Sequence, residues 1–83
     1  MNMPKLVYYG ELRDLTHLRE EHSDADSMNM LMRDIESRHG APAAKAARRC
    51  TITLDGVRVD RPNSRQPIPK DSEICFFPLC SGG

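Results

Sequence analysis

The sequence predicts an α+β domain in which one main helix crosses one face of a mixed sheet. Three observations lead to this fold class. A run of apolar and aromatic residues opens the chain, a run with helical periodicity follows it, and a hairpin signal and a second apolar run come last. With 83 residues, the chain is long enough for a single domain that buries a little over about 60% of its unfolded surface.

The first strand is expected at residues 5–9, Lys-Leu-Val-Tyr-Tyr, a run rich in strand-forming residues that ends at Gly10. Residues 11–26 are ambiguous. Their leucines are spaced like those of a weak helix, whereas residues 16–22 could equally form a polar edge strand.

The main helix is expected over residues 27–39. Ser27 can cap its start, and Gly40 with Pro42 beyond it can end it. Residues 43–49, which are mostly alanine and arginine, are expected to form a short solvated helical turn or a loop. The apolar side of the helix consists of residues spaced at i, i+3, i+4 and i+7, namely Met28, Leu31, Met32 and Ile35.

The second half of the chain predicts a hairpin and a final strand. Asp55-Gly56 separates two strand-like runs and is typical of a type I′ turn. Three prolines make residues 61–69 irregular, and residues 73–79 are expected to form the last strand. Strand, helix, hairpin and terminal strand in this order describe a β-grasp fold, with the helix on one face of the sheet.

The face of the sheet opposite the helix must be polar or must contact a partner. Side chains alternate along a strand, so Val7, Tyr9 and Phe77 are expected to point outward, near the end of the chain. An apolar cluster exposed on a small domain is typical of a docking site, unless a long loop covers it. The inward set is Leu6, Tyr8, Ile74 and Phe76.

The sequence closes with Ser81-Gly82-Gly83, directly after the last expected strand. Glycine lacks a Cβ, so a diglycine segment is slim and can enter a narrow passage. We expect residues 1–83 to form one domain whose residues 78–83 are a flexible tail, with a reach of at most about 20 Å when extended. Another protein's active site could then act on the Gly83 carboxylate, and the alternative is a frayed terminus.

The composition argues against several functional classes. The chain has 12 basic and 12 acidic residues, which disfavours nucleic-acid binding driven by phosphate neutralisation. Residues 1–40 carry five basic and eight acidic groups, and residues 41–83 carry seven and four, so an acidic and a basic side are expected. No signal peptide and no run of about 18 apolar residues is present, which favours a cytoplasmic protein without membrane contact.

The sequence holds no strong metal or nucleophile motif. Cys50, Cys75 and Cys80 fit no CxxC spacing and are interpreted as reduced thiols. The three histidines have acidic neighbours but no ligand spacing, so no metal site is expected. Cys80 lies close enough to Gly83 to trap an activated carboxyl group as a thioester, although a residue without a chemical role is the simpler interpretation.

Two segments resemble the MoaD family, the small subunit of molybdopterin synthase. Residues 5–15, Lys-Leu-Val-Tyr-Tyr-Gly-Glu-Leu-Arg-Asp-Leu, look like its opening strand and turn. Residues 76–83, Phe-Phe-Pro-Leu-Cys-Ser-Gly-Gly, resemble its closing Phe-Phe-Pro-Pro-Val-Thr/Ser/Ala-Gly-Gly signature. Leu79 and Cys80 depart from the second proline and the valine of that signature, and Arg58 occupies a partner-facing position that is often apolar.

The resemblance implies a ubiquitin-like sulfur carrier that is not an enzyme on its own. A MoeB-like E1-like enzyme would adenylate the Gly83 carboxylate with ATP, and a persulfide sulfur would displace AMP to leave a thiocarboxylate. A MoaE-like large subunit would bind the pterin precursor and receive the sulfur in molybdenum cofactor biosynthesis. The chain would bind no cofactor itself and would be the sulfur-donating subunit of a heteromeric sulfurtransferase.

The resemblance also implies roles for individual residues. Gly83 is the reacting residue, and Gly82 keeps the passage clear. Two alternatives with the same fold and tail remain open: a sulfur carrier for thiazole, cysteine or tRNA thiolation, and a ubiquitin-like modifier that forms isopeptide bonds. The residues expected to contact partners are Val7, Tyr9, Arg58, Phe77, Pro78, Leu79, Cys80 and Ser81.

Overall fold

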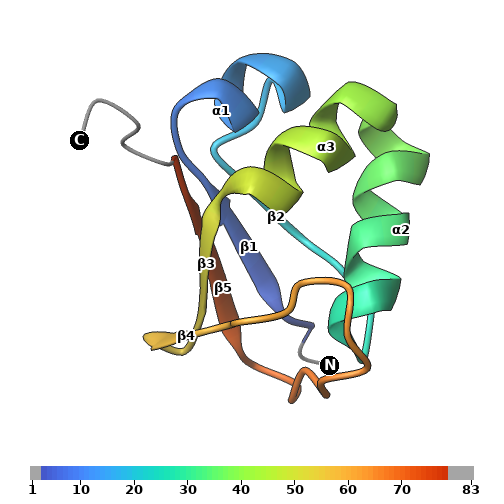
Figure 1. Cartoon of the computed structure of the whole chain (residues 1–83), viewed down its shortest axis with the longest axis vertical. Helices are drawn as coiled ribbons and strands as arrows, with labels where there is room; N and C mark the ends of the chain where they lie inside the picture. The colour runs from blue at the N-terminus through green and yellow to red at the C-terminus, as the bar shows by residue number, and fades with distance from the viewer. Residues whose placement is uncertain (1–2, 79–83) are drawn as a thin grey trace.

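A computed structural model of the chain describes residues 3–78. Strand β1 (Lys5–Tyr8) pairs in parallel with β5 (Glu73–Phe77) at the centre of a five-stranded sheet with the order β2-β1-β5-β3-β4. The other strand pairs are antiparallel. Figure 1 shows the helices packed on one side of this sheet, which confirms the predicted α+β, β-grasp arrangement. The remaining elements are α1 (Glu11–Thr16), β2 (Glu20–His22), α2 (Met28–His39), α3 (Ala41–Arg49), β3 (Thr51–Leu54) and β4 (Val57–Arg58).

The core lies between α2, α3 and the inner face of the sheet. The strand alternation predicts this face correctly, because the side chains expected to point inward are at most 1% exposed. Tyr8 and Phe76 are adjacent in the β1/β5 ladder, and their ring centroids lie 5.5 Å apart. The apolar side of α2 is also buried as predicted. The inner face and this helix side comprise Leu6, Tyr8, Ile74, Phe76, Met28, Leu31, Met32 and Ile35.

The expectation that residues 43–49 are solvated is wrong. They belong to α3, which packs beside α2 and buries four alanines. Pro42 stands in the first turn of α3, where a missing N–H costs nothing. Gly40, with a φ of 94°, ends α2 and also precedes α3. The buried residues of α3 are Ala43, Ala44, Ala46 and Ala47.

The turns follow the sequence closely. Asp55 and Gly56 have φ angles of 51° and 85°, the left-handed pair that a type I′ hairpin turn requires. Asp71 also adopts a left-handed conformation, with a φ of 68°. The ambiguous residues 11–26 contain both candidates, since α1 and the edge strand β2 follow one another there.

A charged network ties the edge strand β2 to the end of α2. Glu21 Oε2 accepts a hydrogen bond of 2.5 Å from the buried Tyr8 hydroxyl and lies 2.6 Å from His39 Nε2. Arg38 Nη1 donates to Glu21 Oε1 at 3.0 Å. Burial alone would raise the pKa of Glu21, but the hydrogen bonds from Tyr8, His39 and Arg38 together outweigh it and lower the pKa below its ordinary value.

This lowered pKa predicts acid sensitivity. The contribution of Glu21 to stability is present above the unfolded-state pKa of about 4.3 and is lost as the pH falls through the lower folded-state value. We expect Glu21→Gln to lose about 1–3 kcal/mol near neutral pH, because its amide replaces a charged acceptor, and to flatten the acid limb of the stability curve. Thermal melts over a pH series measure both effects.

Glu20→Gln is the matched control. Glu20 pairs with Lys5 at 2.9 Å, but both side chains are exposed, so this change should cost far less stability than Glu21→Gln. Equal losses for the Glu20 and Glu21 variants, with unchanged acid limbs, would show that the Glu21 network does not hold the edge strand.

Candidate functional site

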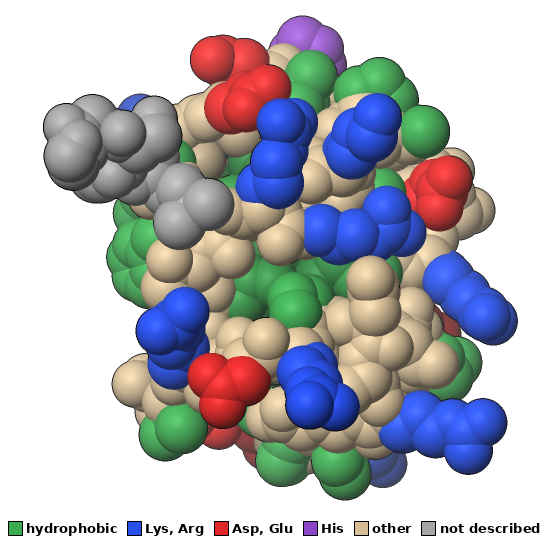
Figure 2. All heavy atoms as spheres, viewed as in Figure 1, with side chains coloured by type: hydrophobic (Ala, Val, Ile, Leu, Met, Phe, Trp, Pro, Cys, Tyr) green, Lys and Arg blue, Asp and Glu red, His purple; other side chains and the backbone are tan. Residues whose placement is uncertain are grey.

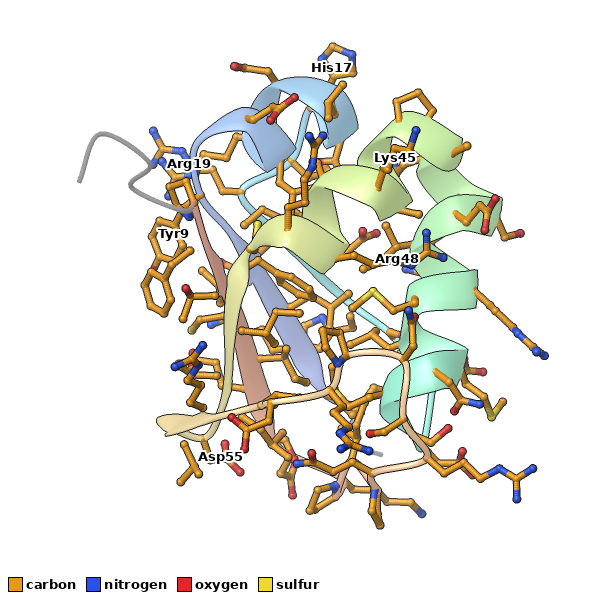
Figure 3. All side chains as sticks on the ribbon, in the orientation of Figure 1. Tyr9, His17, Arg19, Lys45, Arg48 and Asp55 are labelled. Atoms are coloured by element: carbon orange, nitrogen blue, oxygen red, sulfur yellow. The ribbon has the colours of Figure 1, made fainter. Side chains whose placement is uncertain are left out.

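Two aromatic residues meet on the outward side of the sheet: Tyr9, which directly follows β1, and Phe77, the last residue of β5. The rings of Tyr9 and Phe77 stack with centroids 5.0 Å apart and an interplanar angle of 9°. Figure 3 shows Tyr9 on the side of the sheet away from the helices. Arg13 Cζ lies 5.0 Å from the centroid of the Tyr9 ring, and Arg13 Nε donates to the Tyr8 carbonyl at 2.7 Å. We name this surface, which consists of Val7, Tyr9, Arg13 and Phe77, the outer aromatic patch.

The sheet register places Arg58 on the same face as this patch. Paired residues in a ladder project to the same side, and Val7 pairs with Cys75, Cys75 with Thr53, and Thr53 with Arg58. Phe77 is 39% exposed, and Arg58 is exposed on the edge strand β4. The predicted partner-binding residues Val7, Tyr9, Arg58 and Phe77 therefore share one side of the sheet.

The long irregular segment after β4 does not cover the outer aromatic patch. It packs instead at the start of α2, where the Met28 N–H donates to the Gln66 carbonyl and the Asn29 N–H donates to the Ser64 carbonyl. The loop that could have buried the outward side chains lies on the helical side of the sheet.

Gly10 shapes the point where the chain leaves β5. Its φ is 60°, and a Cβ placed on it would lie 3.1 Å from Pro78 Cγ, closer than most side chains tolerate. Pro78 therefore packs directly against the backbone of Gly10. Pro78, Tyr9 and Arg49 also line a hollow of about 110 Å³.

Sequence reasoning missed the roles of Gly10 and Arg13. In the sequence, Gly10 indicates only the end of a strand. The spacing between Arg13 and Tyr9 does not predict that α1 places the Arg13 guanidinium over the Tyr9 ring. The remaining predicted site residues lie outside the described part of the chain: Leu79, Cys80, Ser81, Gly82 and Gly83.

The described residues offer little other chemistry. Cys50 and Cys75 are free thiols, and burial raises the pKa of both, aided by Glu11 near Cys50 and Glu73 near Cys75. Both thiols are therefore protonated and weakly nucleophilic at neutral pH. Within residues 3–78, no group of three or more His, Cys, Asp or Glu side chains is placed to hold a metal ion. In the same part of the chain, no helix has the length and apolarity to cross a membrane.

Known structures share this architecture, although no protein-family model and no curated protein sequence matches the chain. A structure from Pyrococcus furiosus described as subunit 1 of a molybdopterin converting factor is 18% identical, with a TM-score of 0.73, and the match covers 94% of this chain and 98% of that one. SAMP1 from Haloferax volcanii is 15% identical, with a TM-score of 0.74 and coverages of 96% and 98%.

A third similar structure is a complex of subunits 1 and 2 of the molybdopterin-converting factor from Helicobacter pylori 26695. It is 18% identical, with a TM-score of 0.70, and the match covers 98% of this chain and 99% of that one. These neighbours agree with the resemblance seen in the sequence. The chain thus has the ubiquitin-like β-grasp fold of molybdopterin converting factor subunit 1, or MoaD, and of SAMP1.

Proposed function

We propose that the chain is a sulfur carrier that acts as the small subunit of a molybdopterin synthase. The observation that carries this proposal is the position of the outer aromatic patch. The stacked Tyr9 and Phe77 rings face away from the helices, and Phe77 is the last residue of β5. The next residue, Pro78, packs against Gly10. A protein that docks on the patch would sit beside the start of the segment that leads to Gly83. Aromatic residues of this kind are common anchors in protein interfaces.

The proposed chemistry takes place at the Gly83 carboxylate. A carboxylate oxygen attacks the α-phosphorus of ATP, and pyrophosphate leaves. The resulting acyl-adenylate is electrophilic because AMP is a good leaving group. A hydrosulfide or persulfide sulfur then forms a bond to the carbonyl carbon, and the C–O bond to AMP breaks. Hydrosulfide gives the thiocarboxylate directly, whereas a persulfide gives an acyl disulfide whose S–S bond a thiol must reduce.

The proposal assigns separate work to two partners. An E1-like, MoeB-like enzyme supplies the ATP site, and a MoaE-like large subunit binds the pterin precursor, so the chain itself needs no bound cofactor. The complex of subunits 1 and 2 in the Helicobacter pylori structure supports a partner of the second kind. Because the reaction consumes ATP, we place it in the cytoplasm.

The similarity to SAMP1 favours a second candidate, a carrier for another pathway or a ubiquitin-like modifier. One experiment separates the two candidates. The chain is mixed with the E1-like enzyme and the large subunit of its own genome, ATP, sulfide and cyclic pyranopterin monophosphate, and mass spectrometry follows the pterin. A dithiolene product supports the synthase role. An unchanged pterin, together with thiolated tRNA or lysine-linked conjugates in cells, would refute it.

Phe77 should contribute to partner binding more than to folding. We expect Phe77→Ala to weaken binding to the large subunit or the E1-like enzyme by roughly 2 kcal/mol or more, because an exposed aromatic anchor is lost. Isothermal titration calorimetry measures the change. Met30→Ala is the matched control, since Met30 is an exposed apolar side chain on α2 and should bind like the parent. If Met30→Ala weakened binding and Phe77→Ala did not, the partner would bind the helical side of the domain and not the outer aromatic patch.

A further inference from the structure

Basic side chains gather on a face of which only Arg58 is among the predicted partner-binding residues. They come from α3, from the edge strand β4 and from the segment that follows it, and Figure 2 shows Lys and Arg side chains around a patch of hydrophobic side chains on this side. Lys45 and Arg48 are exposed residues of α3, where Figure 3 labels both. We name this surface the basic face. It consists of the exposed residues Lys45, Arg48, Arg49, Arg58 and Arg61.

The fold brings these elements together around one hollow. Its volume is about 220 Å³, and Arg48, Arg49 and Arg58 line it together with Val59, Asp60 and Pro62. Arg48 Nε donates to Asn63 Oδ1 at 3.3 Å, which joins the end of α3 to the segment after β4. The basic face is therefore a tertiary feature rather than a run of charge along one element.

The charges of this face are not neutralised within the described structure. The ion pairs among residues 3–78 use the cations Lys5, Arg38 and His39, and none involves the basic face. Two acidic residues, Asp60 and Glu11, line hollows beside Arg49 without forming an ion pair with it.

Local stability explains only part of this arrangement. Arg48 and Arg49 stand in the last turn of α3, where cations favour the helix dipole. Arg58 and Arg61 lie on other elements and gain nothing from that dipole. A chain of zero net charge that segregates its cations in this way carries local repulsion, which an acidic partner would relieve.

We infer that the basic face docks an acidic surface of the E1-like enzyme that activates the tail. This inference rests on the proposed function and names the chemistry of its partner. Arg49 connects the basic face to the outer aromatic patch. It lines the hollow beside Tyr9 and Pro78 as well as the hollow beside Arg48 and Arg58. A partner seated on the outer aromatic patch can therefore extend round the β3–β4 edge onto the arginines. Arginine favours this contact, since its planar fork binds carboxylates in a bidentate way.

Nucleic acid fits the face less well than protein carboxylates do. Single-stranded nucleic acids bind to basic grooves that also hold aromatic stacking platforms, and none of the residues that line the 220 Å³ hollow is aromatic. The zero net charge also removes the long-range attraction that phosphate binding uses.

The test is charge reversal with a matched control. Arg49→Glu/Arg61→Glu reverses two charges on the basic face, and Arg33→Glu/Lys70→Glu reverses two exposed cations outside it. The rate of thiocarboxylate formation by the E1-like enzyme of the same genome, at several carrier concentrations and two salt concentrations, gives KM and kcat. We expect the first variant to raise KM by about tenfold at low salt, with kcat recovered at saturation and the defect reduced at high salt, and the control to match the parent. Melting curves verify that both variants fold.

Three results would overturn the inference. The first is an unchanged KM for Arg49→Glu/Arg61→Glu while the parent is thiocarboxylated, which would leave the sulfur-carrier role standing. The second is salt-sensitive self-association of the parent that only this variant loses, which would make a second copy the occupant. The third is tighter binding to a single-stranded RNA dodecamer than to a hexaglutamate peptide. If the parent is never thiocarboxylated, the carrier role fails instead, and arginine-dependent binding of hexaglutamate decides the inference alone.

Discussion

Phe76→Ala should unfold this domain at moderate temperature, whereas the adjacent Phe77→Ala should melt within a few degrees of the parent. Phe76 is 0% exposed and packs on Tyr8 in the centre of the sheet. Truncation of a buried Phe typically loses about 3–5 kcal/mol, a large part of a total stability of about 5–15 kcal/mol. For a domain of this size, each kcal/mol lowers Tm by about 4–8 °C.

Phe77→Ala is the internal control, because it removes the same atoms one residue away on the opposite side of β5. Differential scanning calorimetry of the two variants compares the faces directly. If Phe77→Ala proved the more destabilising change, the assignment of inner and outer sheet faces would be reversed, and the outer aromatic patch would be part of a core.

Local signals made much of the fold predictable. Asp55-Gly56 predicts the hairpin because few other residue pairs adopt two left-handed conformations in succession. Leu6 and Tyr8 are identified as inward by strand alternation alone, since their neighbours in the sequence have to project to the other side.

The position of α3 could not be predicted in the same way. Its buried side is made of alanines, which contribute little hydrophobic contrast, and Pro42 suggests the end of a helix as readily as a beginning. The burial of these alanines depends on how closely α3 packs against α2. Small side chains allow this close packing, but the sequence alone does not predict it.

Part of the candidate site was predictable, and part depends on contacts that only the fold creates. Tyr9 and Phe77 follow from alternation along β1 and β5. Gly10 contacts Pro78 because the parallel register pairs Tyr8 with Phe76, and Gly10 and Pro78 each lie two residues beyond that pair. No local sequence pattern around Gly10 predicts a contact with a residue so distant in the sequence.

Loss of the last residue should have the largest effect on function. A chain that lacks Gly83, or that is extended beyond it, should acquire no sulfur. The proposed acyl-adenylate forms only when the terminal carboxylate lies in the partner's ATP site, and either change displaces that carboxylate by at least one residue. Neither change alters the core described for residues 3–78, and the melting curve should match that of the parent. The loss would therefore be chemical and not a failure to fold.

Intact-mass spectrometry after incubation with the E1-like enzyme of the same genome, ATP and sulfide tests the sulfur-carrier role most directly. The intact chain should gain the mass difference between sulfur and oxygen, once per molecule, and the gain should disappear when ATP is omitted or Gly83 is deleted. The same gain in the chain without Gly83, or no gain in the intact chain although the enzyme forms its adenylate, would contradict sulfur transfer at the terminal carboxylate.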